Sequence, residues 1–134
     1  MQFEFLEHTA DVKFRCYGKT LAEVFENVSR ALSHHTNRGE AVKTTQTKEL
    51  SVEGTDHQNL LYNFIDEILY LLDAENFLVA EASVSIEGNN LKATLKGDDS
   101  KGYDNLDHIK AATYAEMYVK QTSKGWEAQA VVDV

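Results

Sequence analysis

The sequence predicts an α+β domain in which two helices pack on a largely antiparallel sheet. Residues 20–35 and 55–76 carry apolar side chains at helical spacing, whereas the segments around them alternate between apolar and polar residues, as strands do. Residues 77–134 contain several such alternating segments in succession, separated by turn-forming residues, which favours antiparallel hairpins. The predicted order β-β-α-β-α-β-β-β-β mixes many strands with only two helices, which is typical of the α+β class. A length of 134 residues suggests one domain, residues 1–134.

The first two predicted strands, residues 2–6 and 12–17, flank a polar cluster with the sequence EHTAD. In the second strand, alternation places three apolar side chains on one face: Val12, Phe14 and Cys16. A reactive cysteine needs exposure and a lowered pKa, so Cys16 is predicted to be a buried thiol rather than a nucleophile.

Residues 20–35 form the first predicted helix. Thr20 and Glu23 have the spacing of a capping box, and an apolar stripe follows along one face: Leu21, Val24, Phe25, Val28, Ala31 and Leu32. His34 and His35 end the helix, where positive charge complements the helix dipole. Because neighbouring helical residues point in different directions, solvent-facing imidazoles are favoured over a metal site there.

Residues 45–54 alternate as a strand does, and residues 55–76 then form the second predicted helix. Thr55 and Gln58 are its predicted capping pair. Its apolar face is wider than that of the first helix, so this helix is expected to be the more buried of the two: Leu60, Leu61, Phe64, Ile65, Ile68, Leu69 and Leu72.

The rest of the chain is predicted to be mostly strands. Gly88-Asn89-Asn90 marks a tight hairpin between residues 77–88 and 89–97, and Ser123-Lys124-Gly125 marks a second one between residues 111–122 and 126–134. The acidic segment between the hairpins, residues 97–107, is expected to be a solvated loop.

Composition and charge exclude several classes of protein. The longest apolar run, LLYNFIDEILYLL, is interrupted by polar residues and is too short to span a bilayer, so no membrane partner is expected. The N-terminus lacks a signal-peptide pattern, and the single Cys16 cannot form an internal disulfide, which together favour a cytoplasmic location. A net charge of −9 repels phosphates, so no tight direct binding of nucleic acid is expected.

Signatures of common catalytic sites are absent: there is no P-loop, no G-x-G-x-x-G, no C-x-x-C and no G-x-S-x-G. The remaining candidates are carboxylates at the two ends of the chain. If the strand at 12–17 pairs antiparallel with the last strand, Asp11 and Asp133 meet at one edge, beside the terminal carboxylate of Val134. Three such groups repel one another unless a cation or protons neutralise them, and oxygen ligands suit Ca²⁺, Mg²⁺ or Mn²⁺. In the alternative, Asp11 caps a turn and Asp133 lies free in solvent.

Five segments in order along nearly the whole chain resemble the archease family: HTADVKF, G-x-T-L-A-E-V-F, LLYNFIDEILYLL, HIKAATY and a terminal VVDV. The chain departs from the family pattern at Gly97-Asp98, where Gly-Glu is usual, and in the loop from Asp99 to Leu106.

This resemblance implies a protein cofactor rather than an enzyme. The implied partner is the GTP-dependent RNA-splicing ligase of tRNA splicing and RNA repair. The resemblance implies that the protein promotes guanylylation of the ligase's histidine and repeated turnover of the ligase. The family's metal site corresponds to Asp11, Asp133 and Val134, and would hold a divalent cation (Ca²⁺, Mg²⁺ or Mn²⁺) with no organic cofactor. Lys110 corresponds to the family's lysine before A-x-T-Y, and His8 lies in the same N-terminal motif, so both are candidate contacts to the partner or to phosphate.

Two other functions are compatible with the residues. The domain could act as a chaperone-like adaptor with broad clients, indifferent to Asp133. It could also be a small metal-dependent hydrolase, which would need an open coordination position and a general base such as His8.

Overall fold

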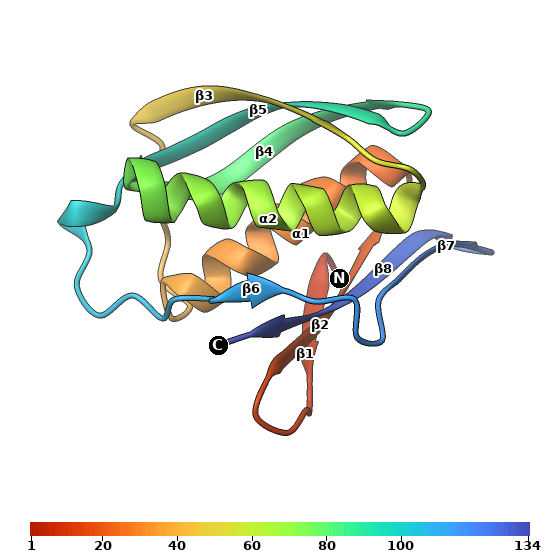
Figure 1. The fold of residues 1–134 in the computed structure, drawn as a ribbon, viewed down its shortest axis with the longest axis horizontal. Helices are drawn as coiled ribbons and strands as arrows, with labels where there is room; N and C mark the ends of the chain where they lie inside the picture. The colour runs from red at the N-terminus through yellow and green to blue at the C-terminus, as the bar shows by residue number, and fades with distance from the viewer.

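The computed structural model describes all 134 residues, and its two helices lie in a layer between two antiparallel sheets (Figure 1). One sheet has the order β1 (Phe3–Leu6), β2 (Val12–Gly18), β8 (Gly125–Asp133), β6 (Ala111–Ala112), and β7 (Tyr118–Thr122) also pairs with β8. The other sheet has the order β3 (Gln46–Glu53), β5 (Asn90–Asp99), β4 (Phe77–Glu87). The predicted α+β class and antiparallel pairing are confirmed, but the strands divide between two sheets, so that each side of the helix layer is covered.

Helix α1 (Leu21–Thr36) begins where the sequence predicts. Thr20 is its N-cap, and its hydroxyl accepts a hydrogen bond from the Glu23 backbone N–H at 3.1 Å. After its last turn the chain enters the left-handed region, with φ +85° at Gly39, whose N–H donates to the His34 carbonyl at 2.8 Å.

The N-cap of helix α2 (His57–Glu75) lies one residue later than predicted. Its N-cap is Asp56, whose carboxylate accepts from the Asn59 N–H at 2.7 Å, so the predicted capping pair of Thr55 and Gln58 is wrong. Asp56 caps the helix because its backbone has the extended conformation of an N-cap residue and its carboxylate reaches a free N–H of the first turn. Neither helix is long and apolar enough to cross a membrane.

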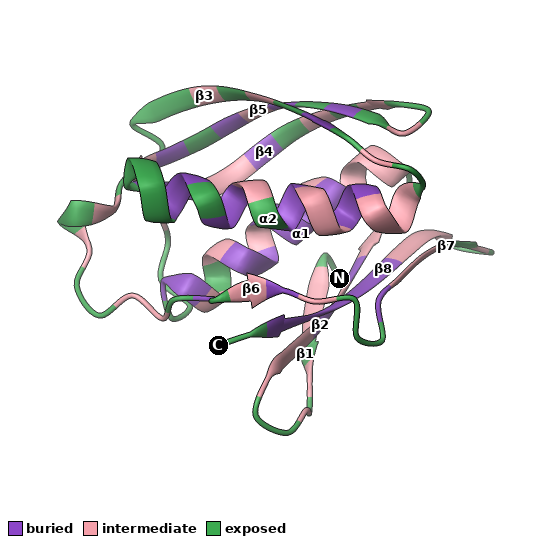
Figure 2. Cartoon of the chain, viewed as in Figure 1, coloured by how far each residue is buried: buried purple, intermediate pink, exposed green.

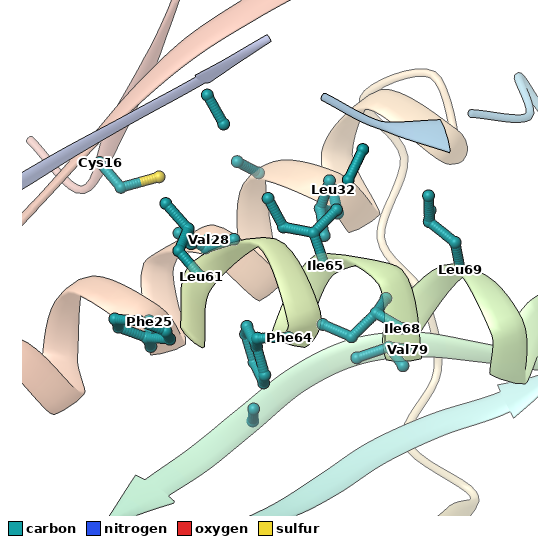
Figure 3. Packing of buried hydrophobic residues seen from close by; sticks show 14 of the residues in the cluster. Cys16, Phe25, Val28, Leu32, Leu61, Phe64, Ile65, Ile68, Leu69 and Val79 are labelled. Atoms are coloured by element: carbon teal, nitrogen blue, oxygen red, sulfur yellow. The ribbon is translucent and has the colours of Figure 1, made fainter. Parts of the chain in front are cut away.

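The hydrophobic core fills the space between the helices and both sheets. Figure 3 shows side chains from α1 and α2 directed toward one another, and the rings of Phe25 and Phe64 lie 5.6 Å apart. Cys16 extends into the same core from β2 and is 0% exposed, as predicted. Burial is confined to the inward side of α2, while its outward side is exposed (Figure 2).

The predicted hairpin between β4 and β5 is present, with Gly88 at φ +63° in its turn, as a tight hairpin turn requires. The expected strand over residues 111–122 is wrong in one respect, because it is two strands, β6 and β7, that both pair with β8. Between them, residues 113–117 stand opposite only Ala130 and Val131 of β8, so the extra residues bend out of the sheet. The left-handed backbone of Glu116, φ 53°, makes this turn.

The acidic segment 97–107 is less loop-like than predicted. Strand β5 continues to Asp99, and a short 3-10 helix, η1 (Ser100–Gly102), follows it. The Asp98 carboxylate accepts hydrogen bonds from the hydroxyls of Thr45 and Tyr103, so it anchors neighbouring segments instead of lying free in solvent.

Candidate functional site

The two ends of the chain are brought together by pairing between β2 and β8. The antiparallel register runs from Gly18 opposite Trp126 to Val12 opposite Val132. One residue further along, Asp11 precedes β2 and Asp133 ends β8, so both carboxylates belong to the same end of neighbouring strands. Figure 1 shows the C-terminus at this end of the sheet. The predicted strand pairing is therefore confirmed.

Lys110 reaches the same end from the opposite side of β8. Ala111 of β6 pairs with Asp133, and the Lys110 N–H donates to the Asp133 carbonyl at 2.7 Å. The Lys110 side chain is exposed and forms no ion pair or hydrogen bond with another residue. Four residues thus lie at one end of the neighbouring strands β2, β8 and β6: Asp11, Lys110, Asp133 and Val134. We call this end of the sheet the carboxylate edge.

His8 lies beside this edge and is held by a residue that the sequence did not single out. Its Nε2 is 2.8 Å from Oε2 of Glu116, and Nζ of Lys13 is 3.0 Å from Oε1 of the same carboxylate. A hydrogen bond from Lys13, and to a lesser extent one from His8, lowers the pKa of Glu116. The only signal for this role in the sequence is that strand alternation fails over residues 113–117.

The other ring nitrogen of His8 faces Asp11 without bonding to it. Nδ1 of His8 is buried without a hydrogen-bond partner, and it lies 4.0 Å from Oδ2 of Asp11. That separation exceeds a hydrogen bond. His8 therefore lies between two carboxylates, firmly bonded to Glu116 and in loose contact with Asp11.

The donor chemistry of the carboxylate edge suits a hard cation. The structure contains no group of three or more His, Cys, Asp or Glu side chains able to hold a metal ion. The predicted ligand set contains only two such side chains, those of Asp11 and Asp133, and its third donor is the main-chain carboxylate of Val134. Carboxylate oxygens of this kind are the ligands that Ca²⁺, Mg²⁺ and Mn²⁺ prefer. The residues fit such an ion by their chemistry, and the site itself stays a prediction.

The remaining candidates have structural roles. Cys16 is fully buried, and this burial raises the pKa of its thiol, in agreement with the predicted buried thiol. His34 stacks on Phe5 with ring centroids 5.7 Å apart, and Nε2 of His35 lies 3.5 Å from Asp107. His34 is exposed, as predicted, but the His35 side chain is only 16% exposed, so the expectation of two solvent-facing imidazoles is wrong for His35.

Comparisons with known proteins agree with the fold and the sequence motifs. A family model described as Archease protein family (MTH1598/TM1083) matches residues 3–134. Proteins named "Protein archease" from Methanosarcina barkeri and Pyrococcus furiosus are 34% and 36% identical to this chain, and each match covers 99% of it. The matches cover 96% and 99% of those two proteins.

The solution structure of protein 1598 from Methanobacterium thermoautotrophicum has the same fold. It matches with a TM-score of 0.80 and 27% sequence identity, and the match covers 98% of both chains. The family model, the relatives and the structure agree with the resemblance seen in the sequence motifs. This chain belongs to the archease family.

Proposed function

We propose that this protein activates a GTP-dependent RNA-splicing ligase through a divalent cation held at the carboxylate edge. Family membership supports the coarser statement, a role as a protein cofactor in tRNA processing. The observation that carries the finer proposal is the pairing of β2 with β8, which brings Asp11 to the end of the strand that carries Asp133.

In this proposal, Asp11, Asp133 and the carboxylate of Val134 bind the cation. When bound, a divalent ion offsets negative charge on a transferring phosphoryl group. Lys110 directly precedes β6 at the same edge and has an exposed side chain, whose ammonium group is suited to a phosphate oxygen of the nucleotide. The edge would dock at the ligase's nucleotide pocket and orient the triphosphate for attack by the ligase's histidine.

The distribution of charge fits a cofactor that leaves RNA binding to its partner. With a net charge of −9, the chain repels an RNA backbone but complements the basic surface that an RNA-binding enzyme presents. A single buried cysteine with no disulfide suits a reducing compartment, and we place the protein in the cytoplasm.

The test is a guanylylation assay of the ligase with wild type, Asp11→Ala, Asp133→Ala and Lys110→Ala. We expect each variant to stimulate at least tenfold less than wild type, a loss of about 1.4 kcal/mol in transition-state free energy. Asp66→Ala, which changes an exposed carboxylate in the middle of α2, is the matched control and keeps full stimulation. If all three edge variants stimulate like wild type, the assigned site is wrong.

Two further measurements separate the ligands from one another. Titration calorimetry of the isolated protein with Ca²⁺, Mn²⁺ and Mg²⁺ reports whether the edge binds a cation without the ligase. Adding one glycine after Val134 moves the terminal carboxylate and leaves both aspartates in place, so it weakens cation binding only if that carboxylate is a ligand.

A further inference from the structure

The turn between β1 and β2, residues 7–11, carries Asp11 but has few bonds of its own. None of the backbone–backbone hydrogen bonds of turns and loops involves these residues. Its one side-chain hydrogen bond to the rest of the protein joins His8 to Glu116. Ala10 has φ 68°, a left-handed conformation that costs an alanine free energy, so the turn is not held by backbone preference either.

The backbone around Glu116 is held by hydrogen bonds to neighbouring elements. Its carbonyl accepts a hydrogen bond from Nε2 of Gln129 at 2.7 Å, and Gln129 is only 5% exposed. Oε1 of Gln129 accepts from Nε of Arg15 at 2.8 Å. The next residue, Met117, is buried, and its carbonyl accepts from Nε2 of Gln58 on α2 at 2.8 Å. The carboxylate is therefore presented by a turn that is fixed to both β8 and α2.

The Glu116 carboxylate thus bonds one residue on each side of Asp11 in the sequence. Oε2 of Glu116 bonds His8 within the turn, and Oε1 bonds Lys13 near the start of β2. Asp11 lies between these two bonded residues in the sequence. Fixing His8 and Lys13 at the same time restricts where the Asp11 carboxylate can lie relative to Asp133.

We propose that Glu116 is a positioning residue for the carboxylate edge: by holding His8 and Lys13, it keeps Asp11 opposite Asp133 and sets the affinity of that edge for a divalent cation. The part of this inference that concerns the cation rests on the proposed function. The part that concerns the turn can be tested without any metal.

The two arms of the experiment use the full chain, without the ligase. Amide hydrogen exchange of residues 7–11 in metal-free buffer reports the order of the turn, and a Mn²⁺ titration reports cation affinity. We expect Glu116→Ala to speed exchange in the turn and to weaken Mn²⁺ binding about tenfold, which is the lower end of the effect of residues that orient metal ligands.

Two matched variants separate positioning from charge. Glu116→Gln removes the charge but keeps the length and a polar end that can bond Lys13 and His8, so it retains most of the order and affinity. Glu75→Ala breaks another exposed ion pair, in which Nζ of Lys48 lies 2.8 Å from Oε1 of Glu75, and changes neither measurement. If Glu116→Gln is as weak as Glu116→Ala while the turn stays ordered in both, the role of Glu116 is electrostatic and the positioning proposal fails.

The double variant His8→Ala with Glu116→Ala tests the route. Because Glu116 acts partly through His8, we expect the double variant to lose less Mn²⁺ affinity, in free energy, than the sum of the losses in His8→Ala and Glu116→Ala alone. Unchanged exchange in Glu116→Ala overturns the inference whatever the cation does. Faster exchange in that variant, together with a wild type that binds no cation, overturns the proposed function and the affinity half of this inference.

Discussion

At the scale of single residues, Asp98 shows how the acidic segment contributes to the fold. Its carboxylate accepts from the Thr45 hydroxyl and from the Tyr103 hydroxyl at 2.8 Å, and Tyr103 Oη accepts from the Lys43 N–H at 2.9 Å. These bonds join the segment before β3 to the loop after η1. A hydrogen bond from Thr45, and to a lesser extent one from Tyr103, lowers the pKa of Asp98 below its ordinary value of 3.8.

We expect Asp98→Asn to destabilise the protein at pH 7 and to have less effect in acid. The folded pKa of Asp98 is depressed, so its stabilising contribution is present above the unfolded value and is lost as pH falls through the folded pKa. Urea unfolding at pH 7 and near pH 3 measures the difference. Asp104→Asn, an exposed neighbour without a hydrogen bond, is the control, and an Asp98→Asn penalty that stays constant with pH would contradict the assignment.

Cys16 gives a second prediction at this scale. The thiol is 0% exposed, and burial raises its pKa, so little thiolate forms and no reagent reaches it. We expect a thiol-reactive dye to leave the folded protein unlabelled over hours and to label one cysteine per chain promptly in denaturing urea. Rapid stoichiometric labelling of the folded chain would show that β2 does not bury this residue.

At the scale of elements, the start of α2 depends on which of two adjacent polar residues caps it. The Asp56 carboxylate bonds the Asn59 N–H, while the Thr55 N–H donates to Oδ1 of Asn59 at 3.0 Å. The two residues therefore share one cap, but only Asp56 contributes its side chain. Sequence spacing could not separate them, because each is a favourable N-cap residue.

We expect Asp56→Ala to lower the free energy of unfolding by about 1 kcal/mol, the typical loss of an N-cap side chain. Thr55→Ala is the matched control, since the Thr55 side chain makes no hydrogen bond and its backbone N–H is kept. Chemical denaturation of the two variants measures both values. Equal losses would mean that the helix begins at the predicted capping pair after all.

At the scale of the whole molecule, the helix layer is shared by two sheets. Helix α1 packs against β4 of one sheet and against β2 of the other, and α2 likewise packs against strands of both (Figure 1). The outward faces of both sheets remain free of helices. The whole chain has a net charge of −9. Such a surface favours a basic protein partner over a nucleic acid.

We expect the isolated protein to bind single-stranded RNA with no saturation up to about 100 µM at physiological salt, because nonspecific affinity comes from phosphate neutralisation by basic residues. Fluorescence anisotropy of a labelled oligonucleotide, at low and at physiological salt, measures this. Saturable binding that weakens steeply with salt would instead reveal a local basic site and would place RNA contacts on this chain.

Local chemistry in the sequence determined the helices, the β4–β5 hairpin and the buried side of β2. The apolar stripes of α1 and α2, the Gly88 turn and the inward position of Cys16 each depend on residues close together in the chain, so their patterns are readable directly. The approach of Asp11 to the Asp133 end of β8 was also predictable, since it needed only one assumed strand pairing.

The tertiary structure alone decided the division into two sheets, the break between β6 and β7, and the contacts of Glu116. Each depends on partners distant in sequence: Glu116 bonds His8 and Lys13, which lie 108 and 103 residues away. The failed alternation over residues 113–117 indicates a break in the strand but not which residues Glu116 bonds, because its partners are selected by the register of β8 and by the turn at 113–117. Sequence periodicity reports which face of an element is buried, whereas the meeting of distant side chains follows only from how the elements pack.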